Sequence, residues 1–353
     1  MFFLISLLLF TPYLIINFAK TPIEKRVVLL SMLVLWCLFS FNSGNNDYNA
    51  YQDIFERPEI YAELGYVALV MVIKYFGGNN AVLIFLVGCF WLYTVNKLEA
   101  VWGVCFSFAL LCYFVYPFVL DITQIRNTIL VLCVFNALLS VNKDRWLFAF
   151  AWTIIGTFFH SLGLFYVLIF LIQRFVPRKV LKKGVYLWSG ILIILTPLII
   201  LYVAPLIPIE RVRGAISNYV ALNIKPVSLL IWGGDFLIFM VILQGLINRL
   251  KGCRDEVAIR KLILMQDFAR IHVLFFAFLL YFFEFNRIYR NLFLLKYAVV
   301  CYSVSLLGRN YRIGAFLYLF INALIFAFFS QFSLDGGYDF TDVLVSNRVF
   351  EFL

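Results

Sequence analysis

Residues 146–172 read WLFAFAWTIIGTFFHSLGLFYVLIFLI, an apolar run that holds one histidine, His160, and no charged residue. A helix needs about 20 apolar residues to cross the hydrocarbon core of a bilayer. This run is therefore long for one crossing and short for two, and His160 and Gly163 mark a place for a break. We predict that the run enters the membrane, turns near His160 and returns, and that 64–76 is then a re-entrant or interfacial helix. The alternative is that each run is a single span.

Similar apolar runs follow one another along the whole chain and leave no stretch for a soluble domain. They predict an all-α polytopic membrane protein, in which residues 1–353 form one bundle of about ten to twelve transmembrane helices. The first run lacks a basic start and a small-residue cleavage site, so we expect it to be retained as a span. Besides 146–172, the runs are 2–19, 27–41, 64–76, 81–96, 100–120, 127–141, 185–209, 227–248, 271–283, 292–308 and 313–329.

The composition excludes an ordinary soluble domain. Hydrophobic residues make up 64% of the chain and charged residues 14%, against about 45–50% and about 25% in soluble proteins. The net charge of +10 comes from short basic loops, none long enough to follow a nucleic-acid backbone. We therefore expect membrane lipids, and no nucleic acid, as partners. The seven cysteines show no metal-ligand spacing, and no metal site is expected.

The loop charges predict an orientation. Segments 173–184 and 249–261 and the loop between Arg309 and Arg312 are basic, which favours the cytoplasmic side. The segments near 42–63 and 210–226 and the short acidic tail 330–353 then lie outside. The NKDR loop at 142–145 is cytoplasmic if the run after it breaks at His160, and outside if every run is a single span.

Ionisable residues at membrane depth are costly and are candidates for function. His160 can serve as a general base or substrate ligand, or it can be a neutral imidazole satisfied by a neighbour; His272, at the edge of a run, is expected to be structural. Arg126 lies between two runs beside Gln124 and Asp121. Its planar donor fork suits a phosphate, although an arginine there can also reach lipid headgroups.

A second cluster, FFEFNRIYRNLF, contains Glu284, Arg287 and Arg290. In a helix these three share one face. Two guanidiniums with one carboxylate leave a positive charge that a diphosphate would balance, whereas interfacial anchoring is the simpler reading. Weaker candidates for the same predicted side are Arg211, Arg213, Asp47, Tyr48, Tyr51 and Glu63, in which tyrosines and carboxylates alternate as they do in sugar sites or at membrane interfaces.

Four local patterns resemble the EpsG/Wzy group of bacterial polysaccharide polymerases. They are Asp47-Tyr48 with Tyr51 followed by Glu63-Leu64-Gly65-Tyr66; Gln124-Ile125-Arg126-Asn127 opening a helix; Phe159-His160-Ser161 about 34 residues after the arginine; and Arg287 with Tyr289 beginning a late span. The order and spacing of these patterns carry the resemblance over residues 45 to 300. Asn127 departs from it, since glutamine more often follows the arginine in such sequences.

This resemblance implies a glycosyltransferase of the GT-C kind, an O-antigen polymerase type that joins undecaprenyl-diphosphate-linked repeat units at the outer face of the bacterial inner membrane. It implies no cofactor and no obligatory metal, and a chain-length regulator and a flippase as partners. Arg126, Arg287 and Arg290, aided by Arg211 or Arg213, would neutralise the leaving diphosphate. His160 would be the general base, with Asp47 and Glu284 as alternatives.

Two other classes of protein fit the same residues. A flippase or transporter of lipid-linked oligosaccharide would bind the diphosphate with these arginines and would work without the base. A membrane acyltransferase that modifies surface polysaccharide would need the histidine but no diphosphate clamp. The chain has no P-loop, GxGxxG, HExxH or paired CxxC motif, which disfavours an ATP-driven pump or a dedicated metal hydrolase.

Overall fold

The computed structural model describes residues 23–43, 47–58, 63–198, 202, 226–253, 255–282, 285–307, 309–332 and 347–348. In this part of the chain the structure is helical, apart from one isolated bridge between Asn42 and Asn347. The predicted all-α polytopic fold is confirmed. The chain divides into two compact units, Met1–Tyr166 with Phe293–Leu353, and Val167–Leu292. The single membrane domain over residues 1–353 stays a prediction.

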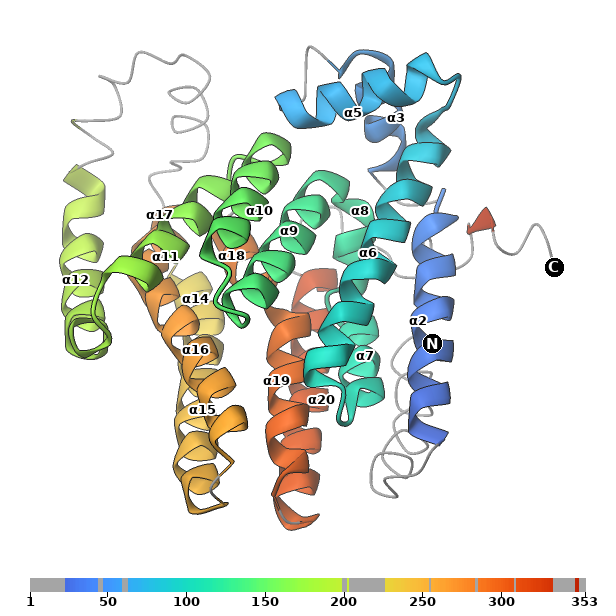
Figure 1. The fold of residues 1–353 in the computed structure, drawn as a ribbon. Coiled ribbons are helices and arrows are strands. Elements are labelled where there is room, and N and C mark those ends of the chain that lie inside the picture. The colour runs from blue at the N-terminus through green and yellow to red at the C-terminus, as the bar shows by residue number, and fades with distance from the viewer. Residues whose placement is uncertain are drawn as a thin grey trace. The chain divides into compact units, whose positions relative to one another are not determined.

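The first unit is built from both ends of the chain (Figure 1). Its described helices are α2 (Ile23–Ser40), α3 (Tyr48–Glu56), α5 (Leu64–Tyr75), α6 (Asn80–Trp102), α7 (Phe106–Val115), α8 (Phe118–Thr123), α9 (Ile125–Val141), α10 (Trp146–Phe159), α19 (Phe293–Ser305) and α20 (Arg309–Phe332).

Helices α7 and α9 form the core of this unit. Nearly every residue of both is buried, as expected for helices that are apolar all round. Helix α7 packs against α19, α2 and α20, and the rings of Phe108 and Phe316 stack with centroids 4.4 Å apart. Between α19 and α20, the buried Lys296 amine donates to Asn322 Oδ1 over 2.7 Å and lies 4.0 Å from the Phe293 ring centroid.

Helices α9 and α10 form a tightly packed antiparallel pair joined by the loop 142–145 (Figure 1). The two helices approach closely at Gly156. A Cβ built there would lie 2.8 Å from Leu130 Cδ1 and 3.1 Å from Cys133 Cβ. Glycine is therefore needed at this position for the two helices to pack as they do.

The predicted break at His160 is confirmed. Helix α10 ends at Phe159, His160 takes an extended backbone conformation (φ −155°, ψ 129°), and α11 (Gly163–Phe175) begins three residues later. At Gly163 a Cβ would meet the Thr157 backbone at 2.6 Å, so the tight turn requires glycine. The return of the chain across the membrane after this break stays a prediction.

The second unit contains most of α11 and the helices that follow it. They are α12 (Arg178–Leu198), α14 (Pro226–Ser228), a π-helical turn (Leu229–Gly233), α15 (Gly234–Cys253), α16 (Glu256–His272), a 3₁₀ turn (Val273–Phe275), α17 (Phe276–Tyr281) and α18 (Asn286–Arg290). Helix α15 packs along α16, and α12 packs against α16 and α17. The Ser189 hydroxyl of α12 donates to the Val273 carbonyl over 2.7 Å, which satisfies a backbone group where α16 changes to the 3₁₀ turn.

Five helices of the described chain are long and apolar enough to cross a membrane: Asn80–Trp102, Arg178–Leu198, Pro226–Gly252, Glu256–Tyr281 and Asn310–Ser330. Shorter apolar helices accompany them, among them Leu64–Tyr75, Phe106–Val115 and Ile125–Val141. The chain is thus a multi-pass membrane protein. The expected run 2–19 lies outside the described residues, as do most of the predicted loop 210–226 and of the tail 330–353.

Several predicted boundaries are wrong, among them the loops 173–184 and 309–312, because α12 begins at Arg178 and α20 at Arg309. The run 100–120 is not one span, because α6 ends at Trp102 and two short helices follow. The residue before a proline disfavours the helical conformation, and Tyr116 is extended (φ −164°, ψ 133°) just before Pro117. The basic segment 249–261 is also not one long loop, since α15 continues to Cys253 and α16 begins at Glu256, where the Asp255 side chain caps the Ala258 N–H.

The packing at Gly156 predicts a specific destabilisation. Replacing Gly156 by leucine places a side chain against Leu130 and Cys133, and overpacking of this kind costs about 1–3 kcal/mol. Thermal unfolding of the purified protein in detergent should shift down by several degrees. The matched control is Gly314→Leu, because a Cβ at Gly314 meets nothing within 4 Å. Equal unfolding temperatures for the two variants would contradict the described register.

Candidate functional site

An ion pair joins the start of α9 to the start of α5. The Arg126 Nη1 donates to Glu63 Oε2 over 2.6 Å, and the two side chains are 25% and 24% exposed. Arg126 is the second residue of α9, and Glu63 immediately precedes α5. The sequence predicts both as site residues, from separate motifs, and the structure brings them together. The pair has no net charge.

Tyr51 completes this cluster from α3. Its side chain is buried together with Phe55 on one face of that helix, and its hydroxyl is hydrogen bonded to the guanidinium and to the backbone N–H of Arg126. Burial raises the pKa of Tyr51, and the positive charge of Arg126 offsets part of that rise. Tyr51 therefore stays a neutral phenol at physiological pH, with a hydroxyl held against the guanidinium.

Two further predicted residues lie on the same helix. Asp47 immediately precedes α3 and is close enough to Tyr51 to act on it electrostatically. Tyr48 accepts a hydrogen bond of 3.2 Å from Arg348 Nη2, so the described residues of the acidic tail contact the same segment. The sequence did not predict α3 as a helix; the apolar spacing of Tyr51 and Phe55, four residues apart, was the available signal.

The register of α9 and α10 determines where His160 lies along the axis of the helix pair; we call this position along the axis its level. Gly156 faces Leu130. His160 is four residues after Gly156, and Arg126 is four residues before Leu130. Because the two helices are antiparallel and each step is about one helical turn, His160 and Arg126 lie at the same end of the pair and at the same level.

The N-terminal end of α5 also reaches this level. A Cβ at Gly65 would lie 2.8 Å from both Cβ and O of Phe158. Glu63 is two residues before this contact and His160 two residues after it. The α5 end that carries Glu63 thus lies beside the α10 end that leads to His160.

His160 is half-buried, and its Nδ1 accepts a hydrogen bond of 3.2 Å from the Leu162 N–H. In a neutral imidazole one ring nitrogen accepts and the other donates. With Nδ1 as the acceptor, the hydrogen is assigned to Nε2. Neutral His160 therefore presents an N–H donor at Nε2.

Buried polar bonds fix the turn before α9. The Trp91 indole donates to the Tyr113 hydroxyl over 3.2 Å, and Tyr113 donates to Asp121 Oδ2 over 2.7 Å. The Thr128 hydroxyl donates to the Asp121 carbonyl over 2.6 Å. Gln124, a predicted substrate ligand, is buried at the junction of α8 and α9. The polar neighbourhood predicted around Arg126 is present, and Asp121 acts in it as a structural acceptor.

The late arginine cluster lies in the second unit. Arg287 and Arg290 are in α18, and their i, i+3 spacing places them on one face, as the sequence predicts. The Arg290 side chain is buried. The Tyr289 hydroxyl donates to the His272 carbonyl over 2.9 Å, and His272 Nδ1 bonds the Phe268 carbonyl at 2.9 Å. Buried His272 is accordingly structural. Arg211, Arg213 and Glu284 lie outside the described residues.

An ionic cluster in the second unit escaped the sequence reasoning. Asp267, within the long apolar helix Glu256–Tyr281, contacts Arg178 Nε and Arg270 Nη1, each over 2.7 Å. A carboxylate inside a span should be paired, so Asp267 with Arg270 three residues later was a readable signal. Among the residues that the structure describes, no group of three or more His, Cys, Asp or Glu side chains is arranged to hold a metal ion.

These features define the class: a multi-pass, all-α membrane protein with a half-buried Arg–Glu–Tyr cluster at a helix end, level with a histidine at a helix break. The model of the EpsG family matches residues 25–341, and the chain belongs to that family. Membership makes it a membrane protein of the polysaccharide polymerase type. No curated protein matches the chain, and no solved structure does.

The cluster predicts energetic coupling between its charges. Replacing Glu63 and Arg126 singly by glutamine should each lower the unfolding temperature in detergent, and the double variant should recover part of the loss. For a partly exposed pair the coupling is about 0.5–1 kcal/mol. The control cycle combines Arg126→Gln with Glu99→Gln, because Glu99, near the C-terminal end of α6, is outside the Arg126 cluster. Additive effects in the Glu63 cycle would be inconsistent with the ion pair.

Proposed function

We propose that this protein is a glycosyltransferase that polymerises undecaprenyl-diphosphate-linked oligosaccharide repeat units into surface polysaccharide. The observation that carries the proposal is the meeting of Tyr51, Glu63 and Arg126 level with His160. Membership of the EpsG family supports it. The enzyme would be of the GT-C kind, in the bacterial inner membrane, with its site facing the periplasm and with a flippase and a chain-length regulator as partners.

The proposed reaction is a displacement at an anomeric carbon. A hydroxyl oxygen of one lipid-linked repeat attacks the anomeric carbon of the growing glycan on another carrier. The bond from that carbon to the diphosphate oxygen breaks, undecaprenyl diphosphate leaves with the electron pair, and the hydroxyl proton passes to a base. Fixed positive charge and N–H donors near the diphosphate oxygens stabilise the charge that develops there.

In this proposal the Arg126 guanidinium binds the diphosphate, and the Glu63 carboxylate orients the guanidinium. The Arg126 side chain is a quarter exposed, which leaves a route for a ligand, while Glu63 and Tyr51 hold the guanidinium in place. Because the Arg126–Glu63 pair is neutral overall, Arg126 cannot by itself balance a diphosphate. Further positive charge is therefore needed, and the residues that the sequence predicts to supply it are Arg287, Arg290, Arg211 and Arg213; their part in the site stays a sequence prediction.

The hydrogen bond at His160 Nδ1 changes the role that we propose for this residue. With Leu162 bound at Nδ1, a neutral His160 offers Nε2–H to the substrate, and it can donate to a diphosphate oxygen. Taking the acceptor proton would require the other tautomer and loss of the Leu162 bond. We therefore assign His160 as a donor to the leaving group, and the carboxylate of Asp47 as the base, because Glu63 is already paired with Arg126.

The first test removes the arginine. Arg126→Ala should lower polymer formation by about 100-fold or more, since removal of one charge-stabilising donor costs about that much. The assay uses purified enzyme and a lipid-linked repeat unit, with ladder products resolved by gel. Arg260→Ala, an exposed arginine on α16, is the matched control and should make normal ladders. If Arg126→Ala or Arg287→Ala makes normal ladders, the substituted arginine does not bind the diphosphate.

The second test separates the two roles of the histidine. A glutamine amide can replace the Nε2–H donor but cannot act as a base. If His160 donates, His160→Gln should keep at least ten times the activity of His160→Ala; if it is the base, both should be equally inactive. His160→Ala should lose about 10²–10³-fold, and a loss of only a few-fold would return His160 to a structural role.

The same preparations distinguish a flippase. Vesicles holding wild-type protein and lipid-linked repeats should yield longer glycans on the carrier. Movement of single repeats between leaflets with no ladder, unchanged in His160→Ala, would instead identify a transporter and overturn the polymerase proposal.

A further inference from the structure

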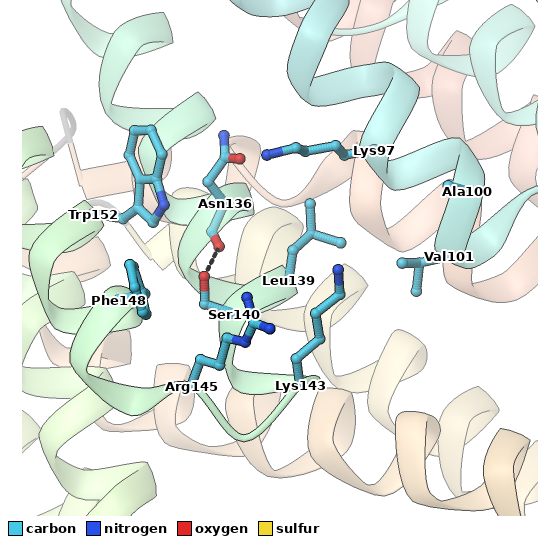
Figure 2. A pocket seen from close by; sticks show the side chains of 10 residues that line it. All are labelled: Lys97, Ala100, Val101, Asn136, Leu139, Ser140, Lys143, Arg145, Phe148 and Trp152. Atoms are coloured by element: carbon cyan, nitrogen blue, oxygen red, sulfur yellow. Dashed lines mark hydrogen bonds between the residues drawn. The ribbon is translucent and has the colours of Figure 1, made fainter.

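A second candidate site lies at the opposite end of the α9–α10 pair. It is a cavity of about 250 Å³ between the last turns of α6, the end of α9 and the start of α10 (Figure 2). Helix α9 is about 25 Å long at 1.5 Å per residue, so this cavity is well separated from Arg126 and His160. It is lined by Lys97, Ala100, Val101, Asn136, Leu139, Ser140, Lys143, Arg145, Phe148 and Trp152.

The lining is cationic. Lys97, Lys143 and Arg145 contribute three positive charges, and no Asp or Glu is among the residues that line this cavity in the described chain. Asp144, in the same loop, accepts from the Trp146 indole over 3.0 Å and does not line it. Figure 2 shows the three basic side chains extending from α6 and from the loop after α9 around one space.

The floor of the cavity is polar and ordered. Asn136 is buried, and its Nδ2 donates to Thr94 Oγ1 over 2.8 Å and to the Leu132 carbonyl over 2.9 Å. The Ser140 hydroxyl donates to the Asn136 carbonyl over 2.8 Å (Figure 2). The bond to Thr94 ties α9 to α6, and the other two lie within α9.

One wall is aromatic and continues into an exposed apolar surface. Trp152 stacks on Phe90 of α6, with centroids 5.9 Å apart at 20°. Phe148, in the lining, is 58% exposed; Tyr93, which contacts the Lys97 amine, is 49% exposed, and Leu147, the residue before Phe148, is 80% exposed. In a membrane protein such side chains face acyl chains, and tryptophans and tyrosines gather at the headgroup level. A ligand held here therefore has an apolar path beside its anionic group.

We propose that this cavity binds the phosphate of an anionic membrane phospholipid, with the acyl chains lying along the exposed apolar side chains of α10 and α6. Several basic residues around one pocket favour an anion. The volume is below the roughly 300–1,000 Å³ of pockets for drug-sized ligands, which suits a headgroup and not an oligosaccharide. Free phosphate shares this chemistry but gains nothing from the apolar side chains. The inference does not depend on the proposed catalytic function.

The test measures lipid retention by native mass spectrometry of the full-length protein. Wild-type protein should retain phosphatidylglycerol at least five-fold more than phosphatidylcholine. Lys143→Gln/Arg145→Gln, two exposed positions, should abolish the difference, and Lys97→Gln should reduce it. The control Lys182→Gln/Lys183→Gln removes the same charge from exposed positions on α12 and should behave as wild type.

Three results would overturn the proposal. Equal retention of the two lipids by wild-type protein would show that no anionic lipid is selected. An equal loss in both double variants would show that only net charge matters. Displacement of phosphatidylglycerol by inorganic phosphate at millimolar concentration would identify a soluble anion as the occupant. Matching unfolding temperatures for all variants ensure that a loss of binding is not a loss of fold.

Discussion

The close packing of α10 on α9 at Gly156 is the contact on which the polar features of the first unit depend. It fixes the register of two helices whose ends carry Arg126, Lys143, Arg145 and His160. With this register, Arg126 and His160 lie at one level, and Asn136, Lys143 and Arg145 at the other end. If α10 slipped along α9 by one turn, it would move by about 5.4 Å. That shift would separate Arg126 from His160 at one end and the cavity-lining residues of the two helices at the other.

Buried polar groups in this protein are held by partners far away in the sequence. Asp121 is bound by Tyr113, which is bound by Trp91; Lys296 is bound by Asn322 and by aromatic rings. An unsatisfied polar group in an apolar interior is costly, so each of these bonds also specifies which helices are neighbours. The apolar residues favour helices in a membrane, and the polar ones select a particular arrangement of them.

Much of the fold was predictable because it depends on local patterns. Apolar runs indicated most helices, and the isolated His160 with Gly163 indicated the break between α10 and α11. Boundaries failed where a local conformation interrupts an apolar run, as at Tyr116 before Pro117. A hydropathy profile does not detect such a position, because hydropathy values contain no information on backbone conformation.

The sequence predicted which residues belong to the candidate site, but it did not predict which of them contact one another. Glu63, Tyr51 and Arg126 were each singled out, but nothing local joins residues separated by more than 60 positions in sequence. Asp267 was missed because Arg178 is far earlier in the chain and because the apolar run was predicted to begin at residue 271, whereas the helix Glu256–Tyr281 includes Asp267 and Arg270. The basic cavity was missed for the same reason: Lys97 and Arg145 looked like separate loop charges until the packing of α6 on α9 joined them.

The division of the first unit between both ends of the chain has a consequence for biogenesis. Helix α7 has ten residues, too few to cross a bilayer alone, and its main neighbour is α19. Residues 116–292 are made between these two helices. At roughly 5–20 residues per second, that interval is about 10–35 s. During this time the insertion machinery or early helices must shelter α7, because its burial is completed only after α19 and then α20 have emerged from the ribosome.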